Sequence, residues 1–294
     1  MLMGVGSTWA QTVDIPTAMG EYIATPNAVT TGTINKNDNS GFGSIQKTAT
    51  ATFTLNNSAT QDLYLSFMTA NNNNSNPNVT IEVTGAEGYT YTKTVDIPNT
   101  GGWAFAQGTT HQLDLGTVPA GECSLKFTFN NASSYVCNLG NIAIHGATQY
   151  TQEPGQYIDL GQGTYNRARA MDKSDAEGGK KVGYVDNGAS CSYNFYMTEQ
   201  AYYNLCMAMH YNGGGTMNVK ITDIATGAEE ANQDIVITSD LAKDYGNEVP
   251  MAITNPLSKG LKNMTLTFTS TGYVIDFENL RLTKIGRASC RERV

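Results

Sequence analysis

Apolar and polar residues alternate in short segments along most of the chain. Alternation with a period of two is found at residues 52–55, 63–67, 79–83, 125–129 and 264–268. It predicts strands with one apolar and one polar face, as in a sheet that packs on one side only. Turn-forming residues separate these segments at short intervals. The pattern predicts an all-β protein of antiparallel strands, folded as a β-sandwich of the jelly-roll type.

The chain contains this pattern twice, at an offset of about 140 residues. Gly43-Ser44-Ile45 corresponds to Gly183-Tyr184-Val185, and the closing segments 138–142 and 276–280 correspond at an offset two residues shorter. A register held over several separate segments indicates two copies of one domain. We place the first β-sandwich at residues 14–147 and the second at residues 150–284, each long enough to bury a core of its own.

The two ends of the chain differ from the rest in composition. Residues 1–10 form an apolar run that ends in small residues, and we interpret them as the remnant of a signal peptide cut after Ala10; a short buried strand is the alternative. Residues 285–294 resemble the translation of a sequencing adapter, and a genuine basic tail is the alternative. We therefore expect a secreted or cell-surface protein whose natural chain continues past Lys284.

Composition and charge narrow the choice of partners. The formal net charge is −8 and only 15% of the residues are charged, whereas Thr, Asn, Gly and Tyr are common. An acidic chain does not favour binding to nucleic acid or to anionic membranes, and no segment is long and apolar enough to insert into a bilayer. A neutral partner fits this composition better.

The chain shows little sign of catalytic chemistry. It contains no recognisable nucleophile, zinc-protease or nucleotide-binding motif, and its three histidines are isolated. We therefore predict that this chain is not an enzyme. Cys123 and Cys137 in the first copy, and Cys191 and Cys206 in the second, could form disulfides in a secreted protein or remain buried thiols.

Several motifs resemble those of family 6 and related carbohydrate-binding modules, which are galactose-binding-like jelly rolls. The second copy supplies residues 181–188 and 193–195, and the first supplies 100–103, 113–115, 119–121 and 137–139, in the family's order. The resemblance implies a jelly roll that holds a glycan at one end of the sandwich. An aromatic pair clamps a sugar ring, whose C–H faces lie flat on aromatic rings, and an Asn near the last hairpin bonds its hydroxyls.

In the first copy, this resemblance assigns carbohydrate binding to Trp103 and Asn138. Ser44 occupies the position of one aromatic wall, and Phe42, two residues away, is the candidate substitute. Trp103 could instead cap the core, and Asn138 could bond only to turn backbone.

In the second copy, Tyr184 is the aromatic wall and Asp276 replaces the Asn, so that an acceptor for hydroxyls remains. Tyr245 is the only aromatic residue available opposite, and Tyr184 could also be a packing residue. Either the first site has degenerated, or the copies bind through different surfaces.

The resemblance also raises the question of a metal. Related modules often hold a structural calcium ion near the termini through an early Glu, and Glu21 is close to that position. The second copy has Gln156 there, which makes the metal doubtful, and we predict no other cofactor.

Together these features predict non-catalytic binding of a polysaccharide or oligosaccharide by tandem modules. We expect the chain to be the N-terminal part of a larger secreted glycan-degrading enzyme with a downstream catalytic domain. The alternative is a structural or adhesion module without sugar binding, since one fold serves many functions.

Overall fold

The computed structural model describes residues 11–37, 41–73, 75–131, 134–150, 155–242, 245 and 247–285. The predicted signal remnant, and all of the predicted artefact except Ile285, lie outside the described residues. The chain divides into two compact units, residues 1–149 and 150–294. Within the described ranges each unit consists of strands and short 3-10 helices, so the all-β prediction is confirmed. No helix among these residues has the length and hydropathy needed to span a membrane.

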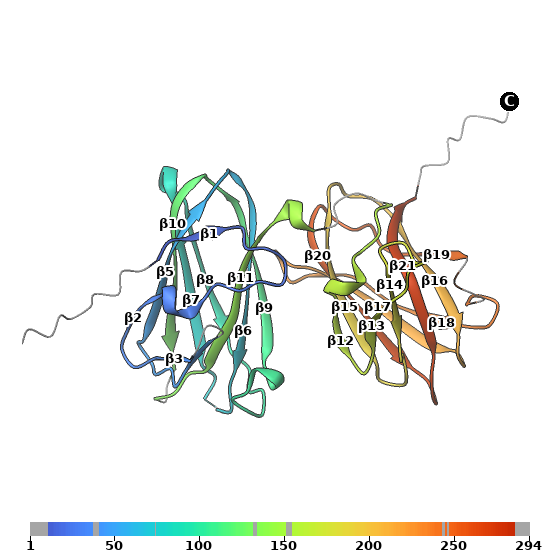
Figure 1. The fold of residues 1–294 in the computed structure, drawn as a ribbon, viewed down its shortest axis with the longest axis horizontal. Helices are drawn as coiled ribbons and strands as arrows, with labels where there is room; N and C mark the ends of the chain where they lie inside the picture. Colours follow the sequence, from blue (N-terminus) through green and yellow to red (C-terminus); the bar gives the residue numbers. More distant parts are fainter. Residues whose placement is uncertain are drawn as a thin grey trace, which may run out of the picture. The chain divides into compact units, whose positions relative to one another are not determined.

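The first unit is a sandwich of two mainly antiparallel sheets (Figure 1). One sheet contains β1 (Val13–Ile15), β2 (Val29–Thr31), β5 (Thr50–Asn57), β7 (Asn78–Thr84), β8 (Thr90–Asp96) and β10 (Gly121–Asn130). The other contains β3 (Asn35–Asn37), β4 (Gly41–Gly43), β6 (Gln61–Ala70), β9 (Thr109–Val118) and β11 (Asn138–Gly146). Its 3-10 helices are η1 (Thr25–Asn27), η2 (Ala86–Gly88), η3 (Phe105–Gln107) and η4 (Ala147–Gln149).

In the part of the second unit that the structure describes, there are two sheets of five strands each. One contains β12 (Thr164–Asn166), β15 (Ser190–Met197), β17 (Gly215–Asp223), β18 (Glu229–Ile237) and β20 (Gly260–Thr269). The other contains β13 (Arg169–Asp172), β14 (Lys180–Gly183), β16 (Tyr203–Tyr211), β19 (Glu248–Ala252) and β21 (Ile275–Lys284). A 3-10 helix, η5 (Leu160–Gln162), precedes β12.

The two units share one topology. Strand order β3-β4-β11-β6-β9 in the first unit corresponds to β13-β14-β21-β16-β19 in the second, and β5-β10-β7-β8 corresponds to β15-β20-β17-β18. The first unit adds β1, which pairs in parallel with β5. The repeated motifs of the sequence therefore fall on equivalent strands, as expected for a duplicated domain.

Each sandwich buries its own apolar core between its sheets. In the first unit, Phe53, Phe67 and Phe127 are fully buried and meet edge to face. In the second, methionines fill much of the corresponding space, and Phe268 stacks on Phe277. The different side chains fill equivalent layers, because a core needs volume and low polarity more than particular residues.

The cysteines of both domains contribute to these cores as thiols. Cys123, Cys137, Cys191 and Cys206 are all free and buried. Burial raises the pKa of the Cys123 thiol to about 11 and that of Cys191 to about 12. Of the two alternatives left open by the sequence, the structure shows buried thiols, and the raised pKa keeps Cys123 and Cys191 protonated and therefore unreactive.

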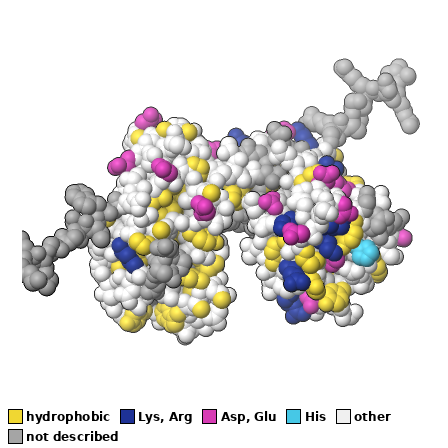
Figure 2. All heavy atoms as spheres, viewed as in Figure 1, with side chains coloured by type: hydrophobic (Ala, Val, Ile, Leu, Met, Phe, Trp, Pro, Cys, Tyr) yellow, Lys and Arg dark blue, Asp and Glu magenta, His cyan; other side chains and the backbone are white. Residues whose placement is uncertain are grey.

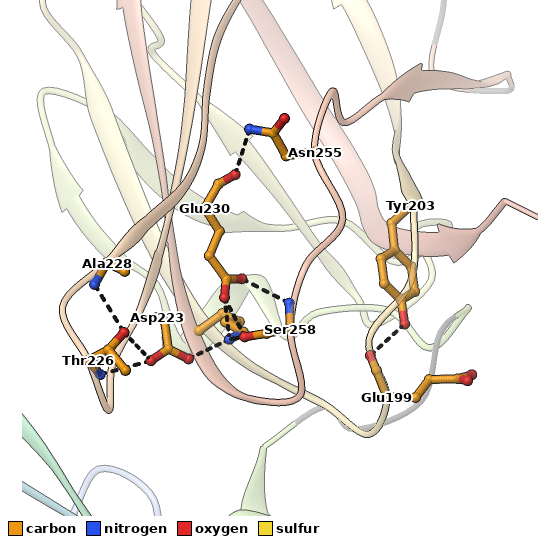
Figure 3. Close-up of polar contacts among 9 residues, drawn as sticks. Glu199, Tyr203, Asp223, Thr226, Ala228, Glu230, Asn255 and Ser258 are labelled. Atoms are coloured by element: carbon orange, nitrogen blue, oxygen red, sulfur yellow. Dashed lines mark hydrogen bonds and ion pairs between the residues drawn. The ribbon is translucent and has the colours of Figure 1, made fainter.

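The second unit also buries a polar cluster. The Lys262 ammonium, whose side chain is inaccessible to solvent, contacts Asp223 at 2.5 Å, Glu230 at 3.1 Å and the Ser258 hydroxyl at 2.6 Å. Figure 3 shows the acceptor side chains of Asp223, Glu230 and Ser258 pointing toward one another. All three ammonium protons have acceptors, which is the condition for burying a lysine. In the first unit the equivalent position is Cys123, so the cluster is not needed for the fold itself.

Candidate functional site

The predicted site residues lie around the strands β4 and β11 of the first unit and their equivalents β14 and β21. Phe42 pairs with Leu139, and Val182 pairs with Phe277, and all four side chains are buried in the cores. Since successive side chains alternate between the faces of a sheet, the neighbouring positions point away from the core. We call the surface formed by these positions the outer face of each unit.

The burial of Phe42 corrects one prediction. Its side chain is fully inaccessible and packs edge to face against Phe53, so it cannot be a wall of a sugar clamp. Alternation within Gly41-Phe42-Gly43 places Phe42 toward the core, just as Val182 faces the core in the second unit. The first unit therefore lacks an aromatic residue at this side of the site.

Ser44 and Tyr184 occupy equivalent positions after β4 and β14. Both have a left-handed backbone, with φ of 51° and 60°. The following residues, Ile45 and Val185, each accept a backbone hydrogen bond from a valine that precedes the last strand. The backbone thus has the same conformation at this position in both units. A left-handed conformation is unfavourable for residues other than glycine. Only the second unit places a ring there.

In the first unit the structure brings Trp103 and Asn138 together. The Asn138 side-chain amide donates a hydrogen bond of 2.7 Å to the carbonyl oxygen of Trp103. The Thr100 hydroxyl closes the same loop by donating to Gly102 and Asn71. Trp103 itself is 37% exposed and is therefore not a core residue. Asn138 does bond to backbone, as in the alternative interpretation, and it does so at the loop that presents Trp103.

Glycines and one aromatic ring form the rest of this outer face. A Cβ atom on Gly41 would lie 2.7 Å from Cε2 of Phe105, so the Phe105 ring packs directly on the strand backbone. Gly140 is the partner of Gly41 in β11. No side chain therefore separates the Phe105 ring from β4 at this position. Phe105 was not predicted, because its role depends on glycines far away in the sequence.

In the second unit, Asp276 and Tyr245 form one cluster with Lys181. Asp276 accepts hydrogen bonds of 3.1 Å from the Lys181 ammonium and 3.0 Å from the Tyr245 hydroxyl. Burial alone would lower the pKa of Lys181, but its bonds to Asp276 and Tyr245 outweigh this effect and raise the pKa. His210 stacks on the Tyr245 ring at 5.2 Å, which orients the ring.

Tyr184 follows Gly183, the residue that adjoins this cluster. It is 50% exposed, and the Arg169 guanidinium lies over its ring at 4.3 Å from the centroid. A Cβ atom on the neighbouring Gly183 would lie 3.4 Å from Oδ1 of Asp276, so the Asp276 carboxylate adjoins the residue before Tyr184. The second unit therefore combines an exposed ring with a carboxylate acceptor, whereas Tyr245 has its hydroxyl engaged by Asp276.

A second, more deeply buried ion pair lies next to this cluster on the outer face. Glu278 is 2% exposed and binds the Lys173 ammonium at 2.9 Å, and Lys173 also binds Asp175. The same ammonium lies 4.8 Å from the Tyr245 ring centroid. Arg169, Lys173, Lys181 and His210 were all missed by the sequence analysis. The alternation in β14 could have indicated Lys181, since its neighbour Val182 is a core residue.

The calcium ion suggested by the resemblance does not fit the described residues. Glu21 is exposed in the loop before η1, where its backbone amide donates to Ala18. Within the described ranges, no three His, Cys, Asp or Glu side chains group as metal ligands would. A calcium site needs several oxygen ligands, and the described residues offer no group of carboxylates for it around Glu21.

The family model for the carbohydrate binding module (family 6) matches residues 20–146 and 163–284, one match in each unit. The chain belongs to this family, and the resemblance noted in the sequence is confirmed. Both matches include the outer-face strands and the loops that carry Trp103, Tyr184 and Tyr245. Comparison with curated proteins gives no match.

Solved structures similar to this chain include two isolated modules and one large enzyme. A β-1,3-glucan binding family 6 module from Bacillus halodurans has 13% identity and a TM-score of 0.34, over 46% of this chain and 98% of that one. A module from Cellvibrio mixtus lichenase 5A, in complex with cellotriose, has 19% identity and a TM-score of 0.31, over 44% and 98%. A Paenibacillus sp. cycloisomaltooligosaccharide glucanotransferase has 16% identity and a TM-score of 0.32, over 44% of this chain and only 18% of that chain.

Proposed function

We propose that this protein binds polysaccharide without chemically changing it, through one site on the outer face of each unit. The observation that carries the proposal is the half-exposed ring of Tyr184, on the residue that follows Gly183, next to which the Asp276 carboxylate lies. The part of the ring that Arg169 does not cover offers an apolar surface for the C–H face of a pyranose, and the carboxylate accepts hydrogen bonds from its hydroxyls. Membership of a carbohydrate-binding family supports the same assignment for both units.

In the first unit, we assign the equivalent site to Trp103 and Asn138. Trp103 is accessible, and the amide oxygen of Asn138 has no hydrogen-bond partner among the described residues. That oxygen is available to accept from a sugar hydroxyl while the amide nitrogen holds the Trp103 loop. The first site thus depends on one ring from the loop before η3, and the second on one ring from the end of β14.

Two sites on one chain suit a polymeric ligand better than a free sugar. A long glycan presents many equivalent binding positions, so attachment of one unit raises the effective concentration of ligand at the other. We expect the full chain to bind a polymer 10²–10⁴ times more tightly than a short oligosaccharide, if both units engage one strand.

The test is calorimetry of the full chain with xylan, β-glucans, galactans and pectins, followed by single variants on the glycan that binds. Trp103→Ala and Tyr184→Ala should each weaken binding and leave the melting temperature nearly unchanged, since both side chains are accessible. Tyr202→Ala is the matched control, because Tyr202 is 53% exposed and precedes β16 at the opposite end of that strand from the site. Absence of binding to every glycan would favour the structural or adhesion alternative.

We also propose that the two units act within a larger secreted glycan-degrading enzyme. The family resemblance supports this role, since a binding module keeps a catalytic domain close to its polymer. Sequencing the reading frame on both sides of this segment tests the proposal. A neighbouring domain without a glycan-degrading motif would overturn it and would leave the binding function untouched.

A further inference from the structure

Among the described residues of the outer face between 167 and 181, one side-chain cation has no acidic partner. Between residues 167 and 181, four side-chain cations bind carboxylates: Arg167 binds Asp186, Lys173 binds Asp175 and Glu278, Lys180 binds Asp172, and Lys181 binds Asp276. The Arg169 guanidinium forms no ion pair and no hydrogen bond with the described residues, and it lies over the Tyr184 ring. Figure 2 shows Lys and Arg side chains gathered among Asp and Glu on the visible face of this unit. Five carboxylates balance these five cations, so the group has no net charge, and Arg169 is the cation of the group that no carboxylate contacts.

The contact with Tyr184 leaves the hydrogen-bonding edge of Arg169 available. A guanidinium over a ring that makes no hydrogen bond of its own keeps its N–H donors for a ligand. Arg169 pairs with Gly183 across β13 and β14, so its side chain leaves the sheet on the same face as Asp276. Two in-plane N–H groups match the two oxygens of a carboxylate, which makes arginine a selective receptor for that group.

The first unit lacks both members of this pair. The position equivalent to Arg169 is Asn35, which pairs with Gly43 as Arg169 pairs with Gly183. The position equivalent to Tyr184 is Ser44. No arginine occurs anywhere in residues 1–149. The positive group therefore belongs to one unit and is not a requirement of the fold.

We propose that the second unit selects an acidic glycan, in which a uronic acid carboxylate binds the in-plane donors of Arg169 while the sugar ring lies against Tyr184. The proposal rests on the proposed function of this site and adds the class of sugar to it. Oδ1 of Asp276, beside Gly183, accepts a hydrogen bond from a hydroxyl of the same sugar or of the next sugar in the glycan. The first unit, whose site is uncharged, takes a neutral stretch of glycan.

The experiment compares two forms of one polymer on the full chain. Polygalacturonate and its carboxyl-reduced product have the same backbone linkages and differ only at C6, where a neutral hydroxymethyl group replaces the carboxylate. We expect the chain to bind the acidic form at least tenfold more tightly than the reduced form at low salt. Added salt should lower this ratio of affinities. In Arg169→Gln the ratio should fall to near one. Arg167→Gln is the matched control, because it removes the same charge two residues away and should keep the ratio.

The outcomes separate this inference from the function on which it rests. If the chain binds neutral glycans but shows no preference for the acidic polymer, the inference is wrong and the binding function stands. If Arg169→Gln and Arg167→Gln reduce the ratio equally, only the general charge matters and the assignment to Arg169 is wrong. If no glycan binds in either form, both proposals fail. Arg169→Lys should recover part of the ratio, since it restores the charge without the paired donors.

Discussion

The two units share a backbone but present different chemistry at the same place. On the outer face of the first, Gly41 leaves room for the Phe105 ring; at the equivalent position of the second, Lys181 binds Asp276. The backbone after β4 and β14 has the same left-handed conformation, although it carries Ser44 in one unit and Tyr184 in the other. Residues that face away from the core can change without disturbing the sandwich. A duplicated module can therefore acquire two binding specificities on one fold.

The largest difference that we expect between the two units concerns the free energy of unfolding. Lys262→Met should lower the free energy of unfolding of the second unit by about 3–5 kcal/mol, because Asp223 and Glu230 would lose a cation in a buried setting. Calorimetry of the full chain, with one transition assigned to each unit, measures the change.

The control for this prediction is Cys123→Ala, at the equivalent position of the first unit. It removes a small apolar group and should cost about 1–2 kcal/mol. A loss below about 1 kcal/mol in Lys262→Met would show that the polar cluster is dispensable in the second unit as well.

Acid should affect the first unit more than the second between pH 6.5 and 4. Burial lowers the pKa of His111 from 6.5 to about 4, and it also lowers that of His145. Below pH 6.5 the unfolded chain takes up a proton that the folded unit does not, so stability falls as the pH drops toward 4. For His111 we expect a loss on the order of 2 kcal/mol, measured from the pH dependence of the melting temperature.

The variant His111→Gln tests the assignment. It should flatten this part of the pH profile in the first unit, apart from the contribution of His145. The equivalent position in the second unit is Val249, which pairs with Met207 as His111 pairs with Phe67. An equal acid response in both units would contradict a cause that is specific to His111.

A gain of binding should follow from giving the first unit the ring that it lacks. Ser44→Tyr places a tyrosine on a backbone that already holds one in the second unit. An added aromatic wall should improve glycan binding by about 0.5–1.5 kcal/mol, or about two- to tenfold. Calorimetry with a neutral oligosaccharide, in a Tyr184→Ala background, isolates the first site. Unchanged affinity would mean that this position does not contact the sugar.

The smallest effect that we expect is on stability, at the left-handed positions Ser44 and Tyr184. Ser44→Gly should stabilise the first unit by up to about 1 kcal/mol, since glycine adopts positive φ without steric cost. Tyr184→Gly should gain less, because it also removes the contact with Arg169. Denaturant unfolding of both variants gives the difference, and a larger gain in Tyr184→Gly would show that this contact contributes no stability.

The candidate site was only partly predictable from the sequence. The motif order led to Trp103 with Asn138 and to Tyr245 with Asp276, and the structure brings each of these pairs together. Phe42 was wrong because the nearest aromatic residue along the chain points to the opposite face of its strand. Arg169 was missed because nothing in its neighbours indicates that it lies over a ring fifteen residues later.

By itself the sequence determined the all-β class, the duplication and the family, because these depend on alternation and repeated motifs that each segment carries locally. Only the tertiary structure decided which side chains meet on the outer faces. Strand pairing brings Lys181, Tyr245 and Asp276 together from three distant segments, and one step in register would turn each strand residue to the other face. The charge that each site presents to a ligand depends on this strand pairing, because the pairing decides which cations are buried or bound to carboxylates.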